Sequence, residues 1–182
     1  MLNILENISL APYTTFKIGG PAKFFIKAES LDILKEALKW SKDKGEEVFI
    51  LGGGSNILVS DHGFNGTVIQ IPFQGWGDEN EAIKIDEKTL IVDSGISLSK
   101  ILAVSAQNGL SGLEWGVGIP GTVGGAIRGN SGAYGKGTGD FIKTVDVFDI
   151  SAMEIKKLSK EECGFYYRGS VFRKNKNLIV LK

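Results

Sequence analysis

The stretch that decides the fold is VFILGGGSNILV, residues 48–59 of the 182-residue chain. Its first four residues predict a short buried strand, and Ile57–Val59 predicts a return to extended structure. The turn between them, Gly52–Asn56, contains three residues without a Cβ, so successive backbone N–H groups can converge on one anion. A plain tight turn is the alternative, but it needs only one or two glycines. We therefore predict an anion-binding turn.

The residues upstream of this turn predict alternating strand and helix. Ala22–Ala28 (AKFFIKA) is typical of a strand entered through a Gly-Gly-Pro turn. Ser30 is a candidate N-cap for a helix that reaches about Lys44, and Gly45 is placed to end that helix. The apolar residues of the helix fall on one face.

The downstream residues predict mainly short strands, at 67–71, 82–86, 89–93, 142–150, 153–158 and 178–181. Glu87-Lys88 suits a hairpin turn, and a second helix is expected from Ser97 to Gly109. The run 178–181 meets the chain end with no evident neighbour, which suggests missing sequence. We predict an α+β fold with two parts, an α/β unit at residues 1–66 and a larger β-rich unit at residues 67–182.

Composition excludes several classes of protein. Lysine plus arginine and aspartate plus glutamate both number 21, and this zero net charge argues against a dedicated nucleic-acid binder. A hydrophobic content of 42% excludes disorder. One cysteine, Cys163, and one histidine, His62, are too few for a disulfide scaffold or a zinc cluster, so we expect no metal. No leader peptide or membrane span is evident, and we expect a cytoplasmic monomer.

Glycine is the abnormal component, with 25 residues, and a second dense run lies in the middle of the chain. Residues 116–121 (GVGIPG) spell the dinucleotide fingerprint, but no strand precedes them and further glycines weaken any long helix after them. We instead place Pro120 in the first turn of a short helix, with free amides from Gly121 to Val123 facing a phosphate. Gly135-Lys136 resembles part of a P-loop, but Asn130 stands in place of its first glycine and Gly137 in place of its Ser/Thr, which disfavours ATP binding.

An aromatic segment near the chain end carries one candidate functional cation. Arg168 follows Phe165, Tyr166 and Tyr167, and a guanidinium can hold a carboxylate through two parallel hydrogen bonds. A structural ion pair explains Arg168 equally well from spacing alone. His62 is expected to be a surface residue, and Cys163 is expected to be inert packing.

Together these motifs resemble one family, the flavoenzyme UDP-N-acetylenolpyruvoylglucosamine reductase, also called UDP-N-acetylmuramate dehydrogenase. The similar stretches are TTFKIGGPA (14–22), LGGGSNILVSDHGFNG (51–66), SGLEWGVGIPGTVGGA (111–126), NSGAYG (130–135) and CGFYYRGSVF (163–172). They occur in the order typical of the family and span nearly the whole chain.

The resemblance implies a two-part FAD-binding unit of the vanillyl-alcohol-oxidase-like (PCMH-type) flavoprotein fold, without the third, substrate-binding domain. Matching positions imply that the pyrophosphate of FAD is held by Gly52, Gly53, Gly54, Ser55 and Asn56. They also imply that the cofactor is lined by Gly118, Ile119, Pro120, Gly121, Thr122, Gly124, Gly125 and Ile179. Neither glycine loop contains histidine or cysteine, so FAD is expected to bind non-covalently.

The resemblance further implies NADPH-dependent reduction of an enolpyruvyl nucleotide sugar, which gives UDP-N-acetylmuramate for peptidoglycan. It implies that Arg168 stabilises the negative charge that develops on the substrate carboxylate, and that Tyr134 and Tyr167 contact the substrate. In the family, a further C-terminal region supplies a proton-donating serine and a glutamate, and no segment of this chain matches it. We therefore expect a reductase fragment of low activity, with a non-catalytic FAD-binding module as the alternative.

Overall fold

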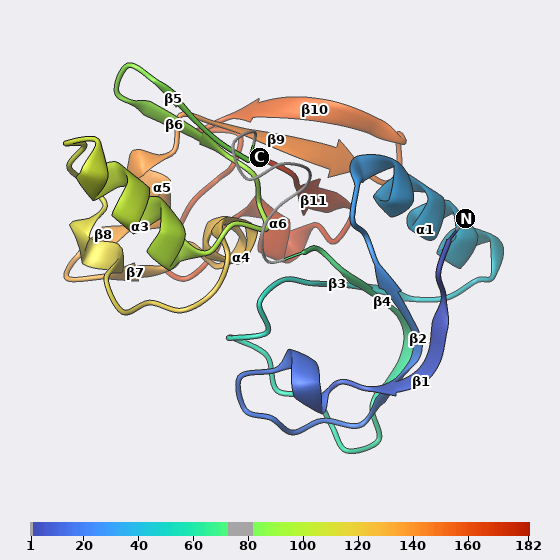
Figure 1. Ribbon diagram of the computed structural model, residues 1–182. Coiled ribbons are helices and arrows are strands. Elements are labelled where there is room, and N and C mark those ends of the chain that lie inside the picture. Colours follow the sequence, from blue (N-terminus) through green and yellow to red (C-terminus); the bar gives the residue numbers. More distant parts are fainter. Residues whose placement is uncertain (1, 73–81) are drawn as a thin grey trace.

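A four-stranded sheet forms the first part of the computed structural model, which describes residues 2–72 and 82–182 (Figure 1). Its strands are β1 (Leu5–Ser9), β2 (Pro21–Lys27), β3 (Val48–Leu51) and β4 (Phe64–Gln70), in the order β1-β2-β4-β3. β1 is antiparallel to β2, whereas β4 is parallel to both β2 and β3. The predicted strands at 22–28 and 48–51 are confirmed.

Helix α1 (Leu31–Asp43) connects β2 to β3 as the sequence predicts. The Ser30 side chain caps it by accepting a hydrogen bond from the N–H of Ile33 at 3.2 Å. Gly45 follows the helix with φ +70°, the left-handed conformation that suits glycine after a helix end. The helix buries Leu34 and Leu38 against one face of the sheet.

The second part is built from hairpins and short helices. β5 (Ile83–Asp86) and β6 (Thr89–Val92) form the predicted hairpin, and α3 (Leu98–Gln107) is the predicted second helix, capped by Ser97. β9 (Thr144–Asp149) pairs antiparallel with β10 (Glu154–Ser159) and with β11 (Leu178–Val180). The shorter elements are η1 (Ala11–Tyr13), η2 (Glu114–Gly116), α4 (Val123–Gly129), β7 (Gly132–Ala133), β8 (Lys136–Gly137), α5 (Thr138–Phe141) and α6 (Val171–Lys174).

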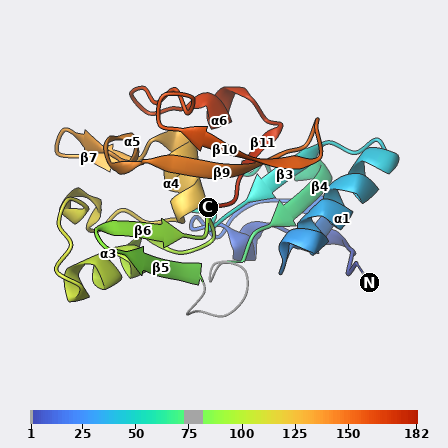
Figure 2. The same ribbon diagram turned by 90° about the horizontal axis from the view of Figure 1, so that it is seen from above.

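Three hydrophobic clusters hold these elements together. One joins the two parts, because Ile26 and Leu34 pack in the same cluster as Phe148 of β9. A second buries α4 between the β5–β6 side and the β9–β10–β11 sheet, as Figure 2 shows, with Ile127 and Phe172 among its buried residues. The third covers the other face of the four-stranded sheet. Helix α4 therefore has a fixed position in the middle of the molecule.

Three details differ from the sequence-based predictions. Residues 57–59 form no strand. Strand β11 does have a neighbour, since Leu178–Val180 pairs with β9, so the expectation that the last strand lacks a partner was wrong. The predicted domain boundary after Gly66 falls inside β4, and β4 pairs with β2 on both sides of Gly66 and with β3 after it. A boundary placed at the end of this strand would follow Gln70. The division into two domains itself stays a prediction.

Candidate functional site

The first glycine loop, Gly52–Asn56, leaves strand β3 with its backbone donors available. None of its five N–H groups donates a hydrogen bond to another described residue. Gly54 has φ +65°, and a Cβ there would lie 1.9 Å from the carbonyl oxygen of Tyr13, so no other residue fits. The Gly54 carbonyl accepts a hydrogen bond from Thr15 at 3.1 Å, which braces the loop. The arrangement suits an anion-binding nest.

The second glycine loop, Gly116–Gly125, ends in α4 and corrects one prediction. The helix begins at Val123, after Pro120, and the Thr122 side chain caps it by accepting from the N–H of Gly125 at 3.3 Å. The Val123 amide is not free, because it donates to the carbonyl of Ile96 at 2.8 Å. Among described residues, the N–H groups of Gly118, Gly121 and Thr122 have no acceptor. The donors of this loop therefore lie before the helix rather than in it.

The two glycine loops touch each other, although they are about 70 residues apart in the sequence. A Cβ added at Gly52 would lie 2.8 Å from the Thr122 Oγ1 atom. A Cβ added at Gly121 would lie 2.8 Å from the Ser55 Oγ atom. A Cβ at Gly118, by contrast, would point into open space. The contact places two sets of free amides beside one another, next to an open volume.

A second cluster gathers Tyr134, Tyr167 and Arg168 around a cavity of about 380 Å³. Both tyrosines are almost fully exposed, at 92% and 88%. The Arg168 guanidinium carbon lies 5.7 Å from the Tyr167 ring centroid, within cation–π range. Asn130, Lys136 and Asp140 also line the cavity, together with the backbone of β7 and β8. These three residues were not among the predicted site residues.

The backbone around this cavity is strained at three residues that are not glycine. Asn130, Tyr134 and Arg168 have φ values of +44°, +53° and +59°. The Asn130 side chain holds this geometry by donating to the carbonyl of Tyr166 at 2.8 Å and accepting from the N–H of Gly139 at 2.9 Å. Such strain persists where the surroundings enforce it, and it clusters at functional sites. Asparagine tolerates this conformation well, so its place in NSGAYG was a usable signal.

Helix α4 separates the two groups of residues. The glycine loops meet at its amino end, and the cavity with Tyr134 follows its carboxyl end. Seven residues of helix span about 10 Å. A ligand that contacts both ends of α4 must therefore be extended.

Four remaining residues fall outside these two groups. Ile179 of β11 pairs with Phe148 of β9 and is 4% exposed, so its side chain packs in the core. That Ile179 contacts a cofactor stays a prediction. Cys163 is buried, and desolvation together with Glu162 and Glu161 raises its thiol pKa to about 11, which suits the predicted inert role. His62 is exposed. The Ser170 hydroxyl is fully buried and donates to the carbonyl of Arg128 at 2.8 Å.

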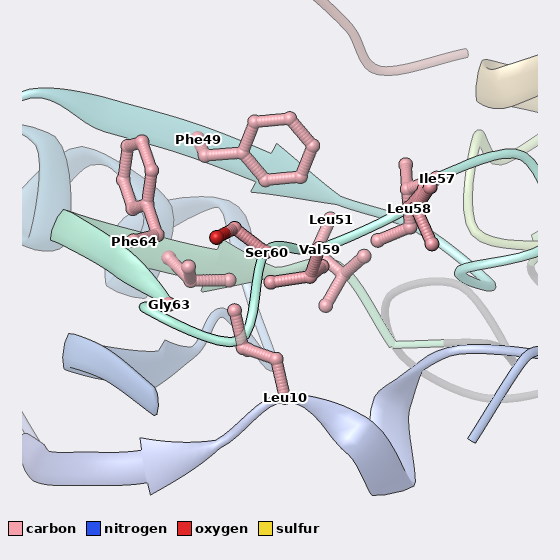
Figure 3. A pocket seen from close by; sticks show the side chains of 10 residues that line it. Leu10, Phe49, Leu51, Ile57, Leu58, Val59, Ser60, Gly63 and Phe64 are labelled. Carbon is pink, nitrogen blue, oxygen red and sulfur yellow. The ribbon is translucent and has the colours of Figure 1, made fainter. Parts of the chain in front are cut away.

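An apolar cavity of about 310 Å³ lies on the face of the four-stranded sheet opposite α1 (Figure 3). Phe49, Leu51 and Phe64 line it from the strands, and residues 57–60 border it. None of the predicted site residues takes part. No helix within residues 2–72 and 82–182 is long and apolar enough to cross a membrane.

The chain matches known proteins over most of its length. The model of the FAD binding domain family matches residues 22–158. A UDP-N-acetylenolpyruvoylglucosamine reductase of Carboxydothermus hydrogenoformans is 39% identical over 177 residues, which is 97% of this chain and 57% of the relative. The crystal structure of the Thermus caldophilus reductase aligns with a TM-score of 0.78 at 32% identity, over 100% of this chain and 60% of that one.

The fold also extends to more distant proteins. A structure of 6-hydroxy-D-nicotine oxidase from Arthrobacter nicotinovorans aligns with a TM-score of 0.70 at 16% identity, over 100% of this chain and 41% of that one. The predicted α+β, vanillyl-alcohol-oxidase-like fold is confirmed. The chain spans a little over half the length of the curated reductases that it matches.

Proposed function

Because the chain belongs to the FAD binding domain family, we propose that it binds FAD non-covalently across its two glycine loops. We further propose that it takes part in the NADPH-dependent reduction of UDP-N-acetylglucosamine enolpyruvate to UDP-N-acetylmuramate, in the cytoplasm. The proposed reduction rests on similarity to the reductases, which extends over nearly all of this chain.

The contact between the two glycine loops carries the proposal. Each loop has backbone N–H groups with no acceptor among the described residues, and free amides on two adjoining loops favour a diphosphate. The two loops can adjoin so closely because Gly52 and Gly121 lack side chains, since an added Cβ at either position would lie 2.8 Å from a side-chain oxygen of the opposite loop. When bound, FAD supplies the hydride relay between NADPH and the substrate alkene.

The residues of the cavity supply orientation and charge in this proposal. Arg168 has five N–H donors in a rigid fork, and it would hold the substrate carboxylate as negative charge develops on it. The strained turn presents this guanidinium beside Tyr167, and the exposed Tyr134, which lines the same cavity, would pack against the substrate. Ser170 is not the proton donor, because its hydroxyl is buried and bonded to the carbonyl of Arg128.

The proposal is tested by refolding the purified chain with FAD and passing it through a gel-filtration column. We expect visible flavin absorbance to elute with the protein. Addition of NADPH under anaerobic conditions should bleach the retained flavin faster than addition of NADH. Colourless protein would refute FAD binding, whereas retained flavin that no nicotinamide reduces would favour a non-catalytic FAD-binding module.

A further inference from the structure

The chain contains only three arginines among its 21 basic residues, and all three lie in one region. Arg128 is on α4, Arg173 is on α6, and Arg168 is in the turn before α6. Every ion pair within the described residues uses lysine as its cation, so none of the three arginines has a carboxylate partner there. All three are exposed. The described residues therefore contain three exposed guanidinium groups, and none of them is paired with a carboxylate.

The packing of α4 against α6 brings the three together. Ile127 and Phe172, each adjacent to one of the arginines, are buried in the same cluster. The Ser170 hydroxyl ties the backbone of Arg128 to the start of α6. The Arg173 guanidinium donates to the carbonyl of Arg168 at 2.7 Å, which leaves its other N–H groups available. Desolvation, and then the charge of Arg173, lower the pKa of Arg128, so the two cations are close enough to repel each other.

Like charges held together without a counter-ion favour binding of an anion with more than one charge. Arginine is the residue suited to two-pronged contacts with phosphate, whereas lysine is a mobile point charge. We propose that Arg128 and Arg173 form a binding site for a phosphoryl group of a nucleotide ligand, beside Arg168. This proposal rests on the proposed function only in the choice of a nucleotide as the ligand.

The test uses the FAD-saturated chain, so that added phosphate compounds do not compete for the glycine loops. Uridine 5′-diphosphate, 2′,5′-ADP and uridine are titrated by isothermal calorimetry into wild type, Arg128→Gln, Arg128→Lys and Lys174→Gln. Lys174→Gln is the matched control, because it also removes one positive charge, from α6, but lies outside the proposed site. The Nζ atom of Lys174 lies over the Tyr166 ring, 4.7 Å from the ring centroid. Arg128 accepts the Ser170 hydrogen bond through its backbone carbonyl, and its side chain is exposed, so the substitutions should leave the fold intact.

We expect Arg128→Gln to weaken binding of a phosphorylated nucleotide by about tenfold or more, and Arg128→Lys to recover only part of that loss. Lys174→Gln should stay within about twofold of wild type, and uridine should not bind. If UDP binding depends on Arg128, the site binds the nucleotide-sugar substrate. If 2′,5′-ADP binding depends on Arg128, the site binds NADPH. Equal affinities for wild type and Arg128→Gln, or equal losses in Arg128→Gln and Lys174→Gln, would overturn the proposal while leaving FAD binding unaffected.

Discussion

Replacing Gly118 by alanine separates cofactor binding from fold stability. Gly118 has φ +81°, and an added Cβ would meet no atom within 4 Å. Gly45 offers the matched control, with φ +70° and equally empty surroundings after helix α1. Both variants force an L-residue into the left-handed region, which costs about 1–2 kcal/mol. Each should therefore lower Tm by roughly 2–8 °C in the FAD-free protein, by differential scanning fluorimetry.

Only the Gly118 variant should affect FAD. If the open volume beside Gly118 is the cofactor cleft, the new methyl group takes space that the cofactor needs. Inserting such a group into a well-packed contact costs about 1–3 kcal/mol, which corresponds to roughly 5- to 150-fold in affinity. Titration of FAD followed by quenching of flavin or tryptophan fluorescence measures the change. Equal FAD affinities for Gly118→Ala and Gly45→Ala would refute the assignment of this loop to the cofactor.

Three further predictions concern single side chains. If the proposed reductase activity is correct, Arg168→Ala in a full-length protein that contains this chain should lower turnover by about 100-fold or more, while flavin content, read from absorbance, stays near wild type. Equal losses of turnover and flavin would make Arg168 structural. Folded Cys163 holds its proton up to a pKa of about 11, above the ordinary thiol value, so its contribution to stability falls as pH rises from about 9. Urea unfolding at pH 8 to 10 should show that fall, and Cys163→Ala should flatten it; an unchanged slope would argue against the shift. Ser170→Ala removes the buried hydrogen bond to Arg128 and should cost about 1–3 kcal/mol in urea unfolding, with FAD affinity unchanged. A variant as stable as wild type would show that this bond contributes little.

Local signals in the sequence predicted local structure well. Helix α1 has a serine cap, one apolar face and a terminal glycine, and all three agree with the structure. The predicted hairpin at Glu87-Lys88 is equally local and is also present. In each case the interacting residues lie within a few positions of each other, so spacing alone was informative.

Contacts between distant residues account for the errors. The pairing of β11 with β9 joins residues about 30 positions apart, and no periodicity in the last strand indicates its partner. Helix α4 was predicted to include Pro120 in its first turn but begins at Val123, because the Thr122 side chain caps it there. The Val123 amide also donates to the carbonyl of Ile96, a contact between distant residues that spacing does not indicate. At the candidate site both glycine loops were predicted, but their mutual contact depends on the packing of the two parts of the chain. The arginine cluster depends in the same way on α4 meeting α6.

The most direct test of the central claim is a crystal structure of the chain grown with FAD. We predict that the diphosphate oxygens accept hydrogen bonds from backbone N–H groups of both Gly52–Asn56 and Gly118–Thr122. FAD bound elsewhere, or held by one of these loops while the other contacts only protein, would contradict the account.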